Sequence, residues 1–206
     1  VGDSYDDLTL NAKTARQIYD TNYQFAKPPE KPALTAVPGD EQVTLFWDDI
    51  AETSWDPISE EYDFEGYVIY RSTDPSFLDQ QNITDINGSR FLFEPLTTIT
   101  GGWAKWDLIN EYEGPSDIPY TGRGISYHLG NNTGLVHSFI DSKNVINGQR
   151  YFYAISSYDH GTKIMGIGPS ESSKTITLNP ETNEIFLDVN TASVVLYLIT
   201  ELQKKL

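Results

Sequence analysis

The chain has 206 residues, and its 14 Lys and Arg against 30 Asp and Glu give a formal net charge of −16 at pH 7. A field of this sign repels phosphate backbones and anionic lipid surfaces, so we expect no nucleic-acid partner. The absence of Cys excludes disulfides, thiol catalysis and thiolate metal sites, and no apolar run reaches the ~20 residues that a membrane-spanning helix requires.

The start of the chain gives an expectation about location. The sequence begins at Val1, with no charged segment followed by an apolar stretch. We therefore expect a piece of a longer protein whose signal peptide has been removed, located outside the cell or at the cell surface. The length favours one sizeable core.

Residues 1–31 are predicted to form a short helix and a Pro-rich linker. Asn11 is placed to cap the first turn, and apolar side chains recur near a helical period at Ala12, Ala15, Ile18, Tyr19 and Tyr23. The segment KPPEKP then prevents the helix from continuing. A helix this short is unstable alone, so its apolar stripe must pack on the main domain, on a preceding domain or on a partner.

From Pro32 onwards, short β-rich runs alternate with turn residues. Two strands flank PGDEQ at residues 38–42, a third covers Phe64–Ser72, and PLTTIT at residues 95–100 is predicted as a fourth. Later runs are VHSFID, NGQRYFYAISSYDHG and SSKTITLNP. This succession predicts an all-β fold, a β-sandwich. Both faces of Phe64–Ser72 are apolar or aromatic, which indicates a central strand that is covered on both sides.

Over residues 32–179 the ordered runs resemble a fibronectin type III domain, which is an immunoglobulin-like β-sandwich. The matching pieces are residues 32–37, VTLFW at 43–47, GYVIYR at 66–71, GQRYFYAISSYD at 148–159 and PSESSKTITL at 169–178. The chain departs from the family pattern by a long insertion at about residues 73–135. With this insertion it resembles a variant found in large secreted bacterial surface proteins.

The resemblance implies roles for six residues. Tyr67 and Ile69 are expected to point between the sheets, where they would meet Trp47, Tyr153 and Ile155. Tyr151 stands where such sandwiches have a corner tyrosine, whose hydroxyl ties the strand entry to a nearby backbone group. All six residues are therefore predicted to be structural.

No pattern in the sequence indicates an enzyme. The three His residues have neither HExxH spacing nor a Gly-x-Ser-x-Gly elbow beside them. Acidic residues near Trp55 suggest paired carboxylates for glycoside hydrolysis, but acidic loops of this kind are far more often solvated linkers. We expect a chain without catalytic activity.

A structural calcium ion is the one cofactor that the sequence suggests. Asp74, Asp79, Asp85 and Asn87 offer oxygen ligands within one polar loop, and Asp85 to Gly88 resembles the start of a calcium loop. The full spacing of such a loop is missing. The competing interpretation is a simple hairpin turn at Asn87-Gly88.

The insertion carries more aromatic residues than a solvent-exposed loop without contacts would. Trp103, Trp106 and Tyr112 are accompanied by Tyr120 and Tyr127. Exposing this much ring surface would favour association, so the rings must be covered. Either the insertion folds back over one sheet face, which is the commoner solution, or it contacts another subunit, a neighbouring domain or a glycan.

Residues 180–206 are predicted to be an apolar tail that makes contacts. The run around Val194, Val195, Leu196 and Tyr197 has no charge and would be an aggregation hazard if it were free. It can pair with an edge of its own sandwich, pack as a terminal helix, or insert into a neighbouring subunit by strand addition. The sequence leaves these three alternatives open.

Together these features predict a non-enzymatic extracellular module that serves as a subunit or domain of a secreted surface assembly or filament. Its expected partners are further copies of itself or neighbouring domains of a larger protein, reached through the terminal segments and the aromatic insertion. The alternative is an adhesion or accessory module that binds polysaccharide through Trp103, Trp106 and Tyr112. We expect no membrane insertion.

Overall fold

The computed structural model describes residues 26–197 together with Tyr5, Leu8, Thr9, Ala12, Ala15, Arg16 and Tyr19. These seven residues have helical backbone, so the predicted helix is helical at the positions described, whereas Ile18 and Tyr23 lie outside the described residues. No helix within this described part of the chain is long and apolar enough to cross a membrane.

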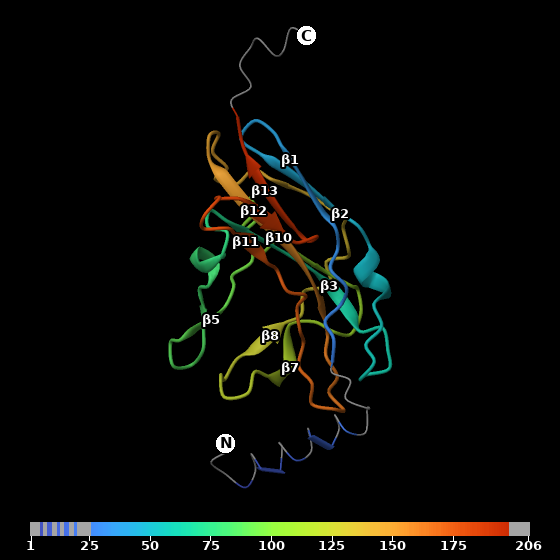
Figure 1. Cartoon of the computed structure of the whole chain (residues 1–206). Helices are drawn as coiled ribbons and strands as arrows, with labels where there is room; N and C mark the ends of the chain where they lie inside the picture. The colour runs from blue at the N-terminus through green and yellow to red at the C-terminus, as the bar shows by residue number, and fades with distance from the viewer. Residues whose placement is uncertain are drawn as a thin grey trace.

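Residues 26–197 are mostly β-strands arranged in several antiparallel sheets, as Figure 1 shows. Two sheets form the body of the molecule, one with the strand order β1-β2-β9 and the other with the order β13-β10-β3-β6. The first consists of β1 (Leu34–Pro38), β2 (Val43–Trp47) and β9 (Ser138–Asp141), and the second of β13 (Thr191–Val195), β10 (Arg150–Asp159), β3 (Phe64–Ser72) and β6 (Lys105–Asp107).

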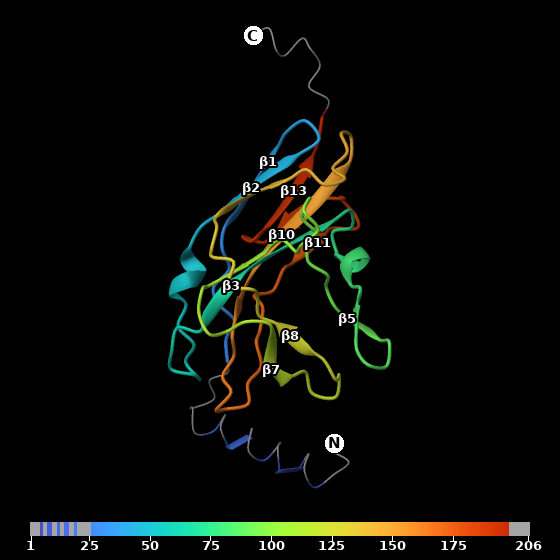
Figure 2. The same cartoon turned by 180° about the vertical axis from the view of Figure 1, so that it is seen from behind.

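Three small hairpins and two short 3-10 turns complete the described structure. The hairpins pair β4 (Ile83–Thr84) with β5 (Arg90–Leu92), β7 (Pro115–Pro119) with β8 (Ser126–His128), and β11 (Ile176–Leu178) with β12 (Ile185–Leu187). The turns are η1 (Ile50–Thr53) and η2 (Leu78–Gln80). In both views of the ribbon, β7 and β8 lie below β3, in the lower part of residues 26–197 (Figures 1 and 2).

The predicted strand at residues 95–100 does not form. Leu96 N donates to Ile69 O on β3, and an isolated bridge joins Thr97 to Trp103. The chain then turns back at once, with Thr98 N donating to Gly102 O and Gly101 N donating to Thr98 O. The fourth strand of the larger sheet is instead β6, which follows that turn and pairs with β3.

The main core lies between the two body sheets. Its fully or nearly fully buried side chains include Trp47, Tyr67, Ile69, Tyr151, Tyr153 and Ile155, the six residues expected there. They sit at alternate positions of β2, β3 and β10, as the two-residue repeat of a strand requires. The Tyr151 hydroxyl accepts a hydrogen bond from Ile146 N at 3.0 Å and donates to Asn144 O at 3.4 Å, which ties the entry of β10 to the preceding loop.

A buried ion pair joins the two sheets at one edge of this core. Arg71 on β3 donates from Nη1 to Asp141 Oδ2 on β9 at 2.8 Å, and the Tyr153 hydroxyl donates to the same oxygen at 2.7 Å. Asp141 is only 1% exposed, so these charge-assisted bonds compensate the loss of its hydration.

A second core covers the outer face of the larger sheet. Val68 and Tyr70 from β3, and Phe152, Ala154 and Tyr158 from β10, are buried on this face. Most residues that cover them come from the insertion and include Phe77, Tyr127 and Leu129, and Ile176 and Ile185 from β11 and β12 add to the cover. The insertion therefore folds back over one sheet face, and β3 is buried on both sides.

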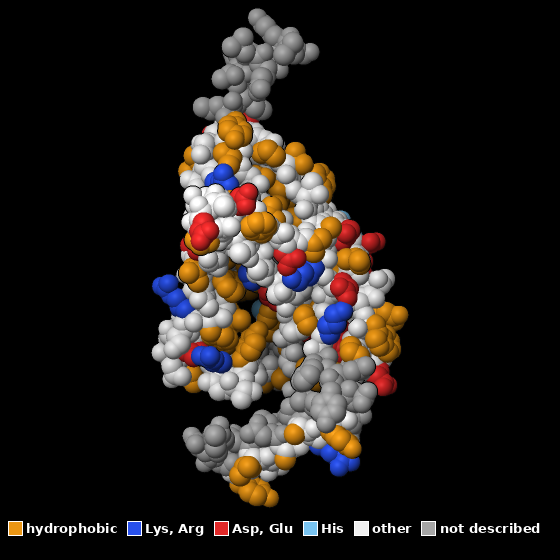
Figure 3. All heavy atoms as spheres, viewed as in Figure 1, with side chains coloured by type: hydrophobic (Ala, Val, Ile, Leu, Met, Phe, Trp, Pro, Cys, Tyr) orange, Lys and Arg blue, Asp and Glu red, His pale blue; other side chains and the backbone are white. Residues whose placement is uncertain are grey.

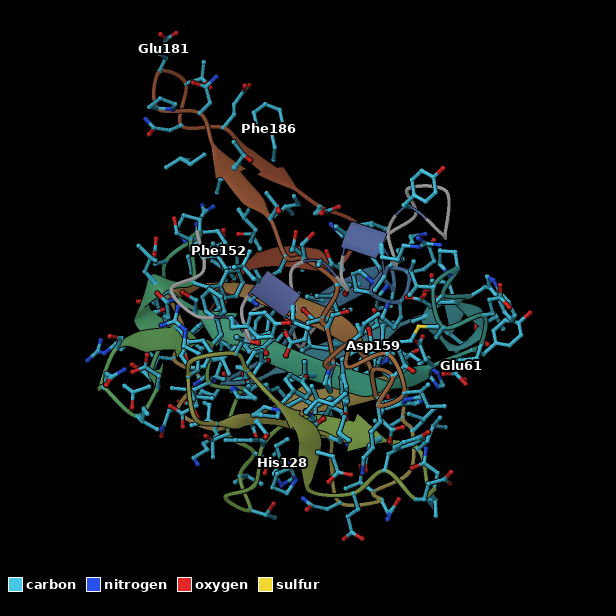
Figure 4. The ribbon with its side chains drawn as sticks, turned by 90° about the horizontal axis from the view of Figure 1, so that it is seen from below. Glu61, His128, Phe152, Asp159, Glu181 and Phe186 are labelled. Atoms are coloured by element: carbon cyan, nitrogen blue, oxygen red, sulfur yellow. The ribbon has the colours of Figure 1, made fainter. Side chains whose placement is uncertain are left out.

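The last strand of the larger sheet is interrupted by a hairpin. Ser172 N donates to Ser157 O beside the second half of β10, and β13 later returns to pair with the first half, from Arg150↔Val195 to Ala154↔Thr191. Between them β11 and β12 leave the sheet, and Figure 4 shows Glu181 and Phe186 on this hairpin standing clear of the body.

The structure therefore corrects the expected boundary at residue 179. Val194 and Leu196 are 8% and 0% exposed and belong to the main core, so the segment to residue 197 completes the domain rather than forming a contact tail. Of the three alternatives for this segment, pairing with an edge of its own sheet is the one observed. Buried Asn190 fixes the return of the chain, because its Nδ2 donates to Ile155 O and Ser173 O.

Candidate functional site

A polar groove lies where the insertion meets the edge strand β6. It has a volume of about 440 Å³ and is lined by Gly101, Gly102, Trp103, Lys105, Asp107, His128, Gly130, Asn131 and Thr133. Trp103 remains 41% exposed, and its ring meets the His128 ring edge to face with centroids 6.2 Å apart. A half-exposed indole beside amide, hydroxyl and carboxylate groups is suited to a ligand that has both a flat apolar face and polar edges.

Asp107 fixes the floor of this groove. Its fully buried carboxylate accepts hydrogen bonds from Asn132 N at 2.6 Å, Thr133 N at 2.9 Å and Thr133 Oγ1 at 2.6 Å. Gly130 lies so close that a Cβ there would be 2.2 Å from the carboxyl group, so this position needs glycine. The floor of the groove is therefore held in place by a buried carboxylate whose oxygens already accept hydrogen bonds from the protein.

Lys105 forms the wall between this groove and a smaller chamber. Its Nζ donates to His128 O at 2.5 Å and lies 4.1 Å and 4.0 Å from the ring centroids of Tyr127 and Tyr158. Burial lowers the pKa of the Lys105 amine to about 7, although Glu171, Asp107 and Glu65 act in the opposite direction. A lysine is thus held in a position where loss of its proton costs little.

The smaller chamber has a volume of about 140 Å³ and is mainly apolar. Its walls include Tyr70, Phe93, Trp103 and Tyr127, and Glu171 lies at its polar end. The hydroxyls of Tyr70 and Tyr127 both donate to the Glu171 carboxylate, each at 2.8 Å from Oε1. The chamber is therefore an apolar space with a fixed arrangement of hydroxyl and carboxylate groups at one end.

Three buried carboxylates gather at a different place, where the linker before β1 meets the end of β10. Asp56, Asp63 and Asp159 line a cavity of about 110 Å³. Burial raises the pKa of Asp63 to about 7, with Asp159 and Asp56 adding to the effect, and burial also raises the pKa of Asp159 to about 6. Among the described residues no group of acids, His or Cys has an arrangement that would hold a metal ion, and these three are no exception.

The four residues suggested as calcium ligands do not converge in the structure. Asp79 accepts from Ser72 Oγ and Thr73 N, and Asp74 accepts from Leu78 N, so both shape the turn after β3. Asp85 accepts hydrogen bonds from Asn87 N, Ser89 N and Arg123 Nη1. With Gly88 at a φ of 80°, this is the bonding of the hairpin turn between β4 and β5, the interpretation that competed with a calcium loop.

The predicted interaction residues are distributed among different places. Trp103 lines the groove, but Trp106 packs into the main core, with its ring 5.8 Å from that of Trp47 and 5.2 Å from that of Phe139. Tyr112 stacks on His160 at 3.9 Å, in a separate pocket of about 340 Å³. The three aromatics expected to bind polysaccharide together therefore do not form one platform, because β6 alternation turns Trp106 inward.

The predicted interaction residues near the end of the chain also differ in their exposure. Val194 and Leu196 are core residues, as described above, and Val195 is half-buried on β13. Tyr197 alone of this group is largely exposed, at 73%. A contact made by this segment would therefore depend on Tyr197 and not on the aliphatic run.

Sequence reasoning missed an apolar patch on the outer face of the smaller sheet. Val37, Phe46 and Ile140 are 47%, 47% and 55% exposed and come from β1, β2 and β9. The register Val37↔Thr44↔Ile140, with Phe46 two positions on from Thr44, places all three side chains on the same face. Figure 3 shows apolar side chains at the surface over β1 and β2. The signal was present in VTLFW, where Phe46 occupies a position at which strand alternation calls for a polar residue.

The chain was compared with family models, curated proteins and solved structures. No family model, curated protein or solved structure matches the chain.

Proposed function

We propose that this chain is a fibronectin type III-like interaction module without enzymatic activity, which serves in a secreted assembly at the cell surface. A three-stranded sheet packed on a four-stranded one supports this, since it is the layered arrangement of immunoglobulin-like sandwiches. The hydrogen bonds of Tyr151 to the loop before β10 are those of a corner tyrosine and support the same assignment.

The patch of Val37, Phe46 and Ile140 is the observation that carries the interaction role. The main core is complete without these side chains, so folding does not explain why three neighbouring strands present apolar groups to water. Clustered apolar side chains on a sheet face mark a contact with another protein surface. The strongly acidic chain favours a partner whose charge is complementary, or self-association once salt screens the repulsion.

Introducing a charge into this patch is expected to abolish association without unfolding the domain. The variant Phe46→Lys with Ile140→Lys should have the mass of a single chain in light scattering at high salt, where the unchanged protein should be heavier. Its thermal midpoint should change little, because both side chains are already about half exposed. Ile164→Lys, at a residue that is 93% exposed outside the patch, is the matched control and should associate normally. An unaffected mass in the double variant would refute the role of the patch.

A second candidate is favoured by the groove beside Trp103, which has the flat ring and polar edges that a sugar requires. Trp103→Ala is then expected to remove binding to a polysaccharide that the unchanged protein retains, by at least ~10-fold in affinity. Trp55→Ala, which removes an exposed indole paired with Tyr62, is the control and should leave binding unchanged. If the intact protein retains no glycan on a broad array, this second function fails.

A further inference from the structure

Lys105 is an unusual lysine, because its amine is directed into the protein and has no anionic partner. Among the residues that the structure describes, no carboxylate lies within ion-pair distance of its Nζ. Its hydrogen-bond acceptor is the neutral carbonyl of His128, and two tyrosine rings enclose it. Burial of an ammonium that makes no ion pair outweighs the more distant charges of Glu171, Asp107 and Glu65, so the neutral amine is populated near pH 7. A neutral amine is a nucleophile.

The chamber beside Lys105 is suited to a small apolar molecule. Its volume of about 140 Å³ is close to that of engineered apolar cavities that bind benzene. Ile83, Leu92, Phe93, Pro95 and Ile125 supply the apolar wall, and Lys105 and His128 supply the polar atoms at the side that it shares with the groove. A ligand can therefore place an apolar body in the chamber with its reactive end at the amine.

A proton carrier is present in the same wall. The Nδ1 atom of His128 is buried and has no hydrogen-bond partner among the described residues. Burial and the nearby Lys105 lower the pKa of His128, so its ring is neutral near pH 7 and can take up or release a proton. No structural role in the fold accounts for this unpartnered nitrogen.

We propose that Lys105 captures small apolar aldehydes in this chamber as a covalent imine. The Nζ lone pair attacks the carbonyl carbon, a C–N bond forms, and the carbonyl π electron pair moves to oxygen. His128 carries one of the two nitrogen protons to this oxygen, which gives a neutral carbinolamine. It then carries the second nitrogen proton to the hydroxyl, and the C–O bond breaks and water leaves as the nitrogen electron pair forms the C=N bond. The balance is one aldehyde and one amine giving one imine and one water, with no oxidant or reductant. The capture does not depend on the apolar patch, whereas its chamber shares Trp103, Lys105 and His128 with the groove proposed for glycans.

Reductive trapping of the full chain tests this proposal. The protein is incubated at pH 7 with limiting benzaldehyde and cyanoborohydride, and the benzylated lysines are located by peptide mapping. Lys105 is expected to react at least ~30-fold faster than exposed Lys163, because an ordinary lysine is almost wholly protonated at this pH. The rate at Lys105 should level off above about pH 7, whereas the rate at Lys163 should continue to rise.

Two controls separate capture in the chamber from general amine reactivity. Lys174 is also buried against aromatic rings, 4.0 Å from those of Tyr70 and Phe93, but it does not line the chamber, and it should remain unmodified. Benzyl alcohol, which has the same body without the carbonyl, should slow labelling of Lys105 by competition. Equal labelling of Lys105 and Lys163, or labelling of Lys105 that benzyl alcohol does not slow, would overturn the proposal. The test uses no Lys105 variant, so a loss of folding cannot imitate a negative result.

Discussion

Replacing Asp63 with Asn is expected to stabilise the domain at pH 8 by up to about 4 kcal/mol and to leave its stability near pH 4 almost unchanged. Asp63 is 4% exposed, and its pKa in the folded state is raised from 3.8 to about 7 by burial, with Asp159 and Asp56 nearby. The folded chain therefore binds this proton more tightly than the unfolded chain does. The stability that protonated Asp63 contributes is fully present below about pH 4 and is lost as the pH rises through about 7.

Urea unfolding at intervals between pH 4 and pH 8 measures this effect, and the slope of stability against pH should become shallower in the Asn variant. Asp159, whose pKa is raised to about 6, and Glu65, whose pKa burial raises to about 7, contribute in the same direction and are expected to leave a residual slope in the Asn variant. Glu60→Gln removes a nearby exposed acid and is the control, with the original slope retained. A stability that rises steadily from pH 4 to pH 8 in the unchanged protein would contradict this account of the acidic cavity.

Truncating Leu196 to Ala is expected to cost about 2 to 5 kcal/mol of unfolding free energy, the range for a large aliphatic side chain removed from a packed core. Leu196 is fully buried with Val194 in the main core, and its backbone also accepts a hydrogen bond from Gly148 N. A chain that ends at residue 179 would lose β13 altogether and is expected not to fold, because the first half of β10 would be left as an uncovered edge.

Tyr197→Ala provides the matched control, since its side chain is 73% exposed one position further along the chain. It should change the free energy of unfolding by less than about 0.5 kcal/mol. If a chain ending at residue 179 folded cooperatively, with the urea midpoint of the full chain, residues 180–197 would be an appendage and the strand pairing described here would be wrong.

The alternation of side chains within single segments predicted the strands and the core positions that depend on those segments alone. The alternation in VTLFW, in Phe64–Ser72 and in the run before Asp159 predicted β2, β3 and β10, and the inward positions predicted their core residues. Pairing between distant segments was not predictable in the same way. Residues 95–100 and 105–107 are both short runs near turns, and the choice between them as the partner of β3 depends on contacts formed only in the folded chain.

The apolar end of the chain shows the same limit. Its apolar composition correctly predicted that the segment is buried. The same composition is compatible with edge pairing, a terminal helix and strand addition to another subunit, so it does not choose among them. Asn190, which bonds to Ile155 O and Ser173 O, anchors the strand that resolves the choice, and nothing in the sequence marks this residue as a structural one. The interruption of the last strand by β11 and β12 likewise has no local signature.

The candidate sites were less predictable than the fold. Trp103 was identified as a residue available for contact, but Trp106 was assigned the same role although strand alternation in β6 directs it into the core. Lys105 was not singled out, because a lysine that stands between Ala104 and Trp106 in the sequence gives no sign that Tyr127 and Tyr158 will enclose it. Phe46 was overlooked even though its position within β2 could have been read from the alternation.

The most direct test of the interaction role is the molar mass in solution, measured by light scattering over a range of protein concentration at low and high salt. The account predicts a mass above that of one chain, 23.2 kDa, which rises with concentration once salt screens the charge of −16, and which returns to one chain in the Phe46→Lys, Ile140→Lys variant. A mass of one chain at every concentration and salt, for both proteins, would contradict self-assembly through the patch on β1, β2 and β9.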